Sequence, residues 1–292
     1  MKEQERIVAI IYDFDGTLAA GNMQEYEFIP KLGMEIDEFW KEANVMADNL
    51  DADSVLTYME CMIRHAREAG MKLTKEFLTD MGRKITLFNG VMEWFDRINE
   101  YGAKKGLKVQ HYINSSGVKE LVEGTPIADK FHKIYASTFL YDKNGEAYFP
   151  AVAVNYTNKT QFIFKINKGI ETVSDSVLVN AFSPHEGRPI PFSRMIFVGD
   201  GLTDIPSMRL INIMGGHAIA VYDPEKEAEK KEDIMKLIRN KRVNFVAKAD
   251  YSPESDISRF MENVLDKIAA DEVIYEQQHA RHIESLENKS EQ

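Results

Sequence analysis

Two short acidic runs stand out because each directly follows a run of apolar residues. The first reads Asp-Phe-Asp-Gly-Thr at positions 13–17, and the second reads Gly-Asp-Gly-Leu-Thr-Asp at positions 199–204. Two carboxylates separated by one residue can share a hard cation, or one can act as nucleophile and the other as general acid and base. The competing interpretations are a solvated acidic turn for the first run and a capped helix N-terminus for the second.

The apolar runs before these carboxylates predict buried strands. Residues 7–12 form a continuous apolar run without alternation, which is typical of a parallel strand buried on both faces. Strands that alternate with helices predict an α/β fold with a Rossmann-like parallel sheet as its core. Ligands of such sheets bind beyond the carboxyl ends of the strands, where both acidic runs stand. Further strands are predicted at 108–113, 195–198, 217–222 and 243–247, and helices at 90–101, 118–124, 159–168, 204–212 and 226–239.

Other segments depart from this alternation. Residues 19–87 are helical in pattern and rich in Met, Glu and Lys, so we predict a small helical cap inserted after the first strand, with residues 1–18 and 88–292 as the core. Asn144-Gly145 is a strong hairpin turn signal and predicts a β-hairpin excursion over residues 133–154.

Two further segments lie toward the C-terminus. Residues 171–193 contain three prolines and predict a short helix followed by an irregular loop. Residues 256–287 predict one or two terminal helices.

With both acidic runs placed after buried strands, the chain resembles the haloacid dehalogenase superfamily over roughly residues 7–221. Positions 13–17 match the first motif of that family and positions 199–204 match the fourth. The helical insert lies between the first and second motifs, as does the cap of the phosphoserine phosphatase branch. The resemblance therefore implies a cap that closes over the site and favours a small phosphorylated metabolite as substrate.

The second and third motifs of that family are less specific. A serine or threonine that ends a strand is matched by Ser115, in preference to Ser116. A lysine near the start of a helix is matched best by Lys159, with Lys165 and Lys168 as competitors. Taken alone, Ser115 would be interpreted as a turn serine and Lys159 as a solvated helix lysine.

The resemblance implies a role for each matched residue. Asp13 would attack phosphorus and form an aspartyl-phosphate, and Asp15 would protonate the leaving oxygen and then activate water. Ser115 would hydrogen-bond the transferring phosphoryl group, and Lys159 would balance its charge. The residues assigned to phosphate binding are Ser115, Ser116, Lys159, Gly16 and Thr17.

The same resemblance implies Mg²⁺ as cofactor. The ion would be held by the carboxylate of Asp13, the backbone carbonyl of Asp15 and the carboxylate of Asp200. Asp204 would complete the metal site through water or brace the other ligands. Mg²⁺ suits oxygen ligands and retains several waters, which agrees with this donor set.

Asp15 also separates activities within the superfamily, because the dehalogenases lack an acidic residue at this place. We therefore predict a phosphatase that hydrolyses a small phosphomonoester. A phosphotransferase or a phosphonate hydrolase on the same scaffold is one alternative. The other is a non-catalytic, regulatory protein that binds a phosphorylated ligand. Glu25, Glu27, Arg64 and Arg67 in the insert could contact an amino-acid-like substrate, although solvated helix faces are the simpler interpretation.

Composition narrows the partners and the location. The 292 residues carry 36 basic and 47 acidic side chains, a net charge of −11, which disfavours nucleic acid as a partner. No apolar run is long enough for a signal peptide core or a membrane span. The single cysteine, Cys61, excludes an intrachain disulfide and fits a reducing cytoplasm. The oligomeric state stays open.

Overall fold

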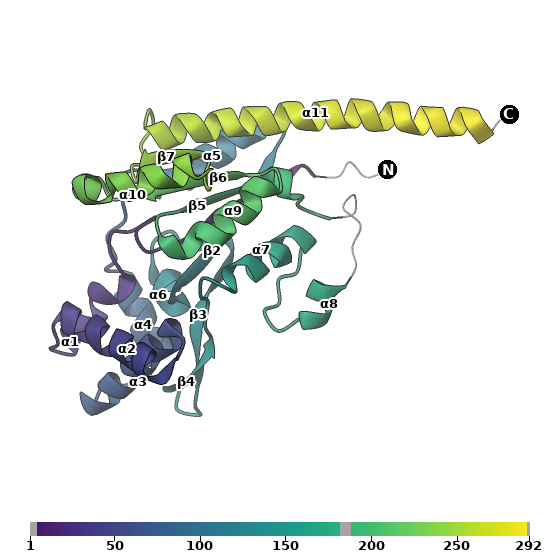
Figure 1. Ribbon diagram of the computed structural model, residues 1–292. Coiled ribbons are helices and arrows are strands. Elements are labelled where there is room, and N and C mark those ends of the chain that lie inside the picture. The colour runs from purple at the N-terminus through teal and green to yellow at the C-terminus, as the bar shows by residue number, and fades with distance from the viewer. Residues whose placement is uncertain (1–4, 182–187, 291–292) are drawn as a thin grey trace.

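A seven-stranded sheet forms the centre of the molecule in a computed structural model, which describes residues 5–181 and 188–290 (Figure 1). The strand order is β4-β3-β2-β1-β5-β6-β7, and every neighbouring pair is parallel except β3 and β4. This is the predicted Rossmann-like α/β core. The strands are β1 (Ile7–Tyr12), β2 (Lys108–Val118), β3 (Phe131–Tyr141), β4 (Ala147–Val152), β5 (Met195–Gly199), β6 (His217–Tyr222) and β7 (Phe245–Lys248).

Two helical layers cover the sheet, which explains why β1 is apolar throughout. Val8 and Ile10 pack in a core with α5 (Val91–Lys104), α6 (Lys119–Gly124) and α11 (Asp256–Ser290). Ala9 and Ile11 face the opposite core, formed with α7 (Lys159–Lys168), α9 (Ile205–Ile213) and α10 (Glu227–Arg239). Because successive residues of a strand point to opposite faces, a strand buried on both sides must be apolar at every position.

The segment from residue 19 to residue 87 is helical, as its pattern predicts. It contains the short helices η1 (Met23–Glu25) and α1 (Phe28–Lys31), followed by α2 (Ile36–Leu50), α3 (Ser54–Glu68) and α4 (Lys75–Gly82). We call it the helical insert. Its two connections to the sheet lie side by side, because Ala19 pairs with Leu87 and Phe88 N donates to Leu18 O at 2.9 Å. The division of the chain into core and cap domains stays a prediction.

The helical insert packs tightly against the rest of the protein through α4 and α6. A Cβ atom at Gly82 would lie 2.0 Å from the carbonyl oxygen of Leu121, and one at Gly124 would lie 1.9 Å from that of Thr79. The two helices therefore meet backbone to backbone, which only glycine permits. Apolar side chains of the insert and of the sheet belong to one continuous core.

The predicted hairpin is present, and the structure gives its first strand a second role. The first half of β3 pairs in parallel with β2 inside the sheet, and the second half pairs antiparallel with β4. Gly145 in the connecting turn has φ +78°. The far end of the hairpin reaches the insert, where Ala147 N donates to Leu73 O at 2.8 Å and Thr74 pairs with Glu146.

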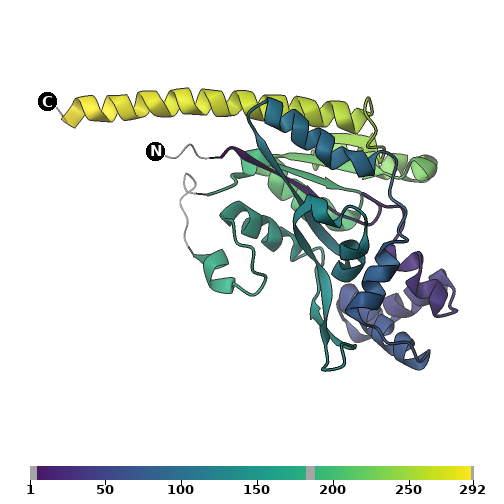
Figure 2. The ribbon, with the colours of Figure 1, turned by 180° about the vertical axis from the view of Figure 1, so that it is seen from behind.

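One long helix, α11, spans the residues 256–287 for which one or two helices are predicted, and it continues to Ser290. Its 35 residues correspond to a length of roughly 50 Å. Figures 1 and 2 show that its C-terminal half extends beyond the sheet. The region 171–193 contains α8 (Ser176–Asn180) and the short helix η4 (Phe192–Arg194), and the part of the predicted loop at 182–187 lies outside the described residues.

Within the described ranges, no helix is both long enough and apolar enough to cross a lipid bilayer.

Candidate active site

The acidic residues of the first motif lie on a tight turn at the carboxyl end of β1. Asp13 N donates to Val198 O at 2.9 Å, which joins this turn to the neighbouring strand β5. Gly16 has φ +70°, and its N–H donates to Ala19 O at 2.7 Å. A left-handed conformation of this kind favours glycine, so the chain can reverse directly after the two carboxylates. Asp13 Oδ1 accepts a hydrogen bond from Phe14 N at 2.8 Å, which leaves Oδ2 for other partners.

Lys159 supplies the positive charge next to Asp13. Lys159 is the first residue of α7, and its side chain is completely buried. Its Nζ atom lies 3.0 Å from Asp13 Oδ2 and 2.6 Å from Asp204 Oδ1. Burial lowers the pKa of Lys159, but the carboxylates of Asp13 and Asp204 raise it by more, so the pKa ends above its ordinary value. The structure thus brings together Lys159 and the nucleophile candidate, from segments far apart in the sequence.

Asp204 is also fully buried, and it holds the loop as well as the lysine. Burial and the Asp13 carboxylate raise the pKa of Asp204 to about 8, against the lowering effect of Lys159. The short distance to Nζ is that of a charged pair, so we place the shared proton on the lysine. Gly201 N donates to Asp204 Oδ2 at 3.3 Å. Asp204 therefore orients Lys159 and stabilises the loop after β5.

Asp15 is held in an environment that favours its protonated form. Its side chain is partly accessible from the cavity described below, yet the surrounding protein desolvates it. This desolvation raises the pKa of Asp15 well above its ordinary value, and the carboxylates of Asp13 and Asp200 raise it further. Met23 N, in the helical insert, donates to Asp15 Oδ1 at 2.9 Å and partly offsets the shift. The insert thus orients a carboxylic acid that can donate a proton.

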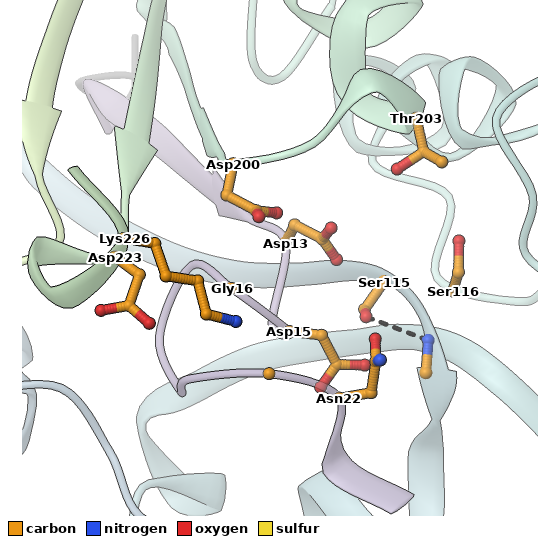
Figure 3. A pocket seen from close by; sticks show the side chains of 12 residues that line it. Asp13, Asp15, Gly16, Asn22, Ser115, Ser116, Asp200, Thr203, Asp223 and Lys226 are labelled. Carbon is orange, nitrogen blue, oxygen red and sulfur yellow. Dashed lines mark hydrogen bonds between the residues drawn. The ribbon is translucent and has the colours of Figure 1, made fainter. Parts of the chain in front are cut away.

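Ser115 lies in the second half of β2, where the pairing with β3 is irregular between Asn114 and Val118. Its hydroxyl accepts a hydrogen bond from Gly117 N at 3.1 Å and remains able to donate (Figure 3). Ser116 is held through its backbone, because its carbonyl accepts from Tyr58 Oη at 2.6 Å and from Ser137 Oγ at 3.0 Å. Both serines line the cavity next to Asp13.

A cation fits the donor set at this end of the sheet. Carboxylate oxygens of Asp13, Asp200 and Asp204 lie within 4.8 Å of one another, and all are hard donors of the kind that Mg²⁺ accepts. The side chain of Asp15 is not part of this group. A Cβ atom at Gly16 would lie 2.2 Å from Asp200 Oδ2, so the first-motif loop leaves room for that carboxylate. The carboxylates of Asp13, Asp200 and Asp204 carry more negative charge than Lys159 offsets, and a divalent cation would balance that excess.

These side chains open into a cavity of about 330 Å³ (Figure 3). Its described lining includes residues that are not among those predicted for the site, among them Asn22, Thr203, Asp223 and Lys226. Asp223 directly follows strand β6, and Lys226 ends the short helix η6 (Pro224–Lys226) after it. The rule that ligands bind at the carboxyl ends of parallel strands could have identified them, because β6 is predicted from its apolar run.

Some predicted site residues lie elsewhere. Thr17 is fully buried, its hydroxyl has no hydrogen-bond partner, and it is not among the described residues that line the cavity. The predicted phosphate contact of Thr17 is therefore corrected to a place in the core, where the turn from Phe14 to Leu18 directs its side chain inward. Lys165 Nζ donates to Thr172 O at 2.8 Å, and Lys168 Nζ donates to Ala181 O at 2.7 Å, so both competitors of Lys159 bind local carbonyls instead.

Four charged residues of the insert are possible contacts of an amino-acid-like substrate by sequence. In the structure they bind other side chains or are exposed. Glu25 accepts from Asn22 Nδ2 at 2.6 Å and from Trp40 Nε1 at 2.8 Å. Arg64 pairs with Glu42. Glu27 pairs with Lys31 at 3.1 Å, and Arg67 is exposed on α3. None of the four is among the described residues that line the cavity.

The sheet, its strand-end carboxylates and the buried lysine define a class of protein, and comparison of the sequence with known families agrees. Residues 10–209 match the family of haloacid dehalogenase-like hydrolases. The chain belongs to this family and is a hydrolase by that membership.

The individual proteins that the chain resembles have low sequence identity to it. The chain is 29% identical over 281 residues to an uncharacterized protein of Borreliella burgdorferi, with 86% of this chain and 94% of that protein covered. Its fold is similar to that of a substrate-bound phosphoserine phosphatase, with a TM-score of 0.53, 16% identity, and coverage of 89% of this chain and 99% of that one. A phospho-aspartyl intermediate analogue of phosphoserine phosphatase gives a TM-score of 0.52 at 17% identity, with the same coverage. These likenesses concern the fold.

Proposed function

We propose that this protein is a phosphatase that hydrolyses a small phosphomonoester through a phosphorylated Asp13. The observation that carries the proposal is the 3.0 Å contact between Asp13 Oδ2 and the buried Lys159 Nζ, beside an Asp15 whose pKa is raised. The nucleophile and the proton donor come from the turn after β1, and the positive charge comes from the start of α7, so two segments far apart in the sequence meet beside one cavity. The fold's likeness to phosphoserine phosphatases, one of them an analogue of a phospho-aspartyl intermediate, supports the same chemistry.

In the first step, an Asp13 carboxylate oxygen attacks phosphorus in line with the leaving oxygen. The bond from phosphorus to the leaving oxygen breaks, and Asp15 gives its proton to that oxygen, so an alcohol leaves. Ser115 donates to a phosphoryl oxygen, and the Lys159 ammonium offsets the negative charge that spreads over the phosphoryl group.

In the second step, water attacks the phosphorus of the aspartyl-phosphate. Asp15, now ionised, takes a proton from this water, and the bond between phosphorus and the Asp13 oxygen breaks. Inorganic phosphate and the free Asp13 carboxylate result, with Asp15 protonated again. A pKa above the ordinary value suits a group that must give and take a proton in turn.

Mg²⁺ would be held by the carboxylates of Asp13 and Asp200, and Asp204 would brace Lys159 and the loop after β5. The ion would supply charge neutralisation at the phosphoryl oxygens and would orient the ester for in-line attack. The cluster of three carboxylates supports this assignment.

The experiment is phosphate release from para-nitrophenyl phosphate, measured with Mg²⁺ and with a chelator, for the wild type and for Asp13→Asn. We expect release that requires Mg²⁺ and falls by at least about 10³-fold in the variant, because the amide is a poor nucleophile. Acid quenching after incubation with substrate should also trap phosphate on the wild-type protein and none on the variant. Substantial turnover by Asp13→Asn would remove Asp13 as the nucleophile.

A matched control is Asp129→Asn, which changes an exposed carboxylate of the short helix η2 (Ala128–Lys130). This variant should keep the wild-type rate. Adding alcohols as alternative acceptors separates hydrolysis from transfer, since a phosphotransferase would form a new ester in place of inorganic phosphate.

A further inference from the structure

A second cavity opens from the first on the side of the helical insert. It has a volume of about 180 Å³ and shares Asp15, Asn22, Ser116, Gly117 and Thr203 with the cavity that holds Asp13. Because Asp15 borders both, a phosphoryl group beside Asp13 would direct its leaving group into this second space. We call it the leaving-group pocket. It is smaller than the roughly 300–1,000 Å³ of sites for drug-sized ligands, which indicates a leaving group with a single ring or a short chain.

One wall of the leaving-group pocket is an aromatic corner. The rings of Trp40 (α2) and Tyr58 (α3) meet edge to face, with centroids 5.8 Å apart. Their polar atoms are engaged by the protein: Trp40 Nε1 donates to Glu25, and Tyr58 Oη donates to the Ser116 carbonyl. The corner is therefore fixed in orientation and offers aromatic carbon to a ligand.

Side-chain amides line the same pocket. Gln24 is 1% exposed, and its Oε1 atom is buried with no hydrogen-bond partner among the described residues. A buried amide oxygen without a hydrogen-bond donor is destabilising, and a ligand hydroxyl that reached it would remove that penalty. Asn44, on α2, adds a second amide, and Ser54 and Thr203 add hydroxyls.

Charge is the feature that separates this pocket from an amino-acid site. Among the described residues that line it there is no lysine, arginine or histidine, and Asp15 is the one acid. Lys226 borders the first cavity instead, and Figure 3 places it on the far side of Asp13 from Ser116 and Thr203. A leaving group with a carboxylate, such as serine, would lose its hydration here without gaining a cation, which is unfavourable in a desolvated site.

Aromatic carbon, amides and hydroxyls without a cation suit an uncharged molecule that has both C–H faces and hydroxyl groups. We therefore propose that the leaving group is a neutral polyol of monosaccharide size, so that the substrate is a sugar monophosphate. Gln24 and Asn44 would bind its hydroxyls, and the Trp40–Tyr58 corner would pack against its ring. The inference rests on the proposed phosphatase function and adds the substrate class.

The first test compares kcat/KM for glucose phosphate, phosphoserine, adenosine monophosphate and para-nitrophenyl phosphate with Mg²⁺ present. We expect glucose phosphate to exceed phosphoserine by at least about 100-fold, since a site built for hydroxyls discriminates strongly against a misplaced charge. A preference for phosphoserine or for adenosine monophosphate would overturn the inference and leave the phosphatase function intact. Release from none of the four would count against the phosphatase function itself.

Binding supplies a test that does not need turnover. Asp13→Asn can be titrated calorimetrically with glucose phosphate and with phosphoserine. Tighter binding of glucose phosphate supports the inference even if no ester is hydrolysed, and equal or tighter binding of phosphoserine overturns it.

Variants of the two amides locate the contact. Gln24→Met keeps nearly the same side-chain volume and removes the amide, and Asn44→Ala removes the exposed one. For each, the ratio of kcat/KM for glucose phosphate to that for para-nitrophenyl phosphate should fall about tenfold, mainly through KM. Asn49→Ala, which changes an exposed residue of the same helix α2 outside the described lining, should keep the wild-type ratio. Unchanged ratios in both amide variants would overturn the assignment.

Discussion

Lys159 Nζ lies 2.6 Å from Asp204 Oδ1, and neither side chain is exposed to solvent. The lysine begins α7 and the aspartate follows β5, so the pair ties a helix to the loop of the fourth motif. The same ammonium reaches Asp13 at 3.0 Å. A change at Lys159 is therefore expected to affect both stability and chemistry.

Replacing Lys159 with methionine should remove activity and weaken the fold. We expect kcat to fall by at least about 10³-fold, because charge on the phosphoryl group loses its main protein partner. Without the lysine, Asp13 and Asp204 become unpaired buried acids, so the free energy of unfolding in chelator should drop by about 3–5 kcal/mol. Urea denaturation and steady-state kinetics measure the two effects separately.

Lys165→Met and Lys168→Met are the matched controls, since both lysines lie on the same helix. Their ammonium groups bind carbonyls of the following segment and do not approach Asp13. Both variants should keep turnover close to that of the wild type. Loss of activity in Lys165→Met or Lys168→Met, with Lys159→Met active, would reassign the third motif.

Asp15→Asn should separate the two half-reactions. A nitrophenolate needs no proton to leave, whereas an alkoxide does, so the first step should slow by about 10²–10⁴-fold for an alkyl phosphate and much less for para-nitrophenyl phosphate. In the second step the variant has no base to take the proton from water, so that step should stay slow. Para-nitrophenyl phosphate should therefore give a burst of nitrophenol close to one equivalent of enzyme. Stopped-flow absorbance detects the burst, and its absence would argue against Asp15 acting in the second step.

The same substitution should stabilise the metal-free protein in a pH-dependent way. The folded-state pKa of Asp15 is raised, so its contribution to stability is complete below the ordinary value of 3.8 and is lost as the pH rises through the raised pKa. Asp15→Asn cannot ionise and escapes this loss. In chelator, its Tm should match the wild type only near about pH 3.5, and its advantage should grow as the pH rises, to roughly 2–4 °C near about pH 9.

Calorimetry in chelator measures this difference, and the exposed-site variant Asp129→Asn should show no such dependence on pH. A Tm advantage of Asp15→Asn that grows as the pH falls would have the wrong sign and would reject the explanation.

Gly16→Ala should displace the carboxylate of Asp200, a candidate metal ligand, although the two residues are far apart in the sequence. The new Cβ would lie 2.2 Å from Asp200 Oδ2, so that carboxylate must move, and we expect kcat to fall at least about 100-fold with weaker activation by Mg²⁺. Gly33→Ala is the control, because Gly33 has the same φ of +70° and nothing within 4 Å of its added Cβ. It should cost about 1–2 kcal/mol of stability for the left-handed conformation and leave turnover unchanged.

The apolar runs predict the strands well because a parallel sheet buried on both faces tolerates no polar position. The first half of β3 is the exception: the turn signal at Gly145 predicts a hairpin over residues 133–154, but it does not predict the parallel pairing of β3 with β2. A turn determines which strands are antiparallel neighbours, but it carries no information about the other edge of a strand.

The candidate site likewise contains some residues that the sequence predicts and others that depend on how the chain packs. Asp13, Asp15 and Asp200 follow directly from their strands, whereas the choice among three lysines of α7 depends on how that helix packs. Lys159 points inward because it begins α7 near the carboxyl ends of the strands. The spacing of the lysines in the sequence does not predict this placement. Residues of the insert such as Gln24 could not be predicted, since long-range packing brings them to the cavity.

The helical insert contacts the rest of the protein at several separate places, among them its paired connections at Ala19 and Leu87, the glycine contact between α4 and α6, and the main-chain hydrogen bond from Ala147 to Leu73. A body attached at two points can still rotate about the line that joins them, and a third point off that line removes the rotation. A swing of the insert as a rigid lid would therefore have to break at least one of these contacts. We therefore expect substrate to enter and product to leave through local movements at the cavity mouth, so that the release rate depends on the side chains there.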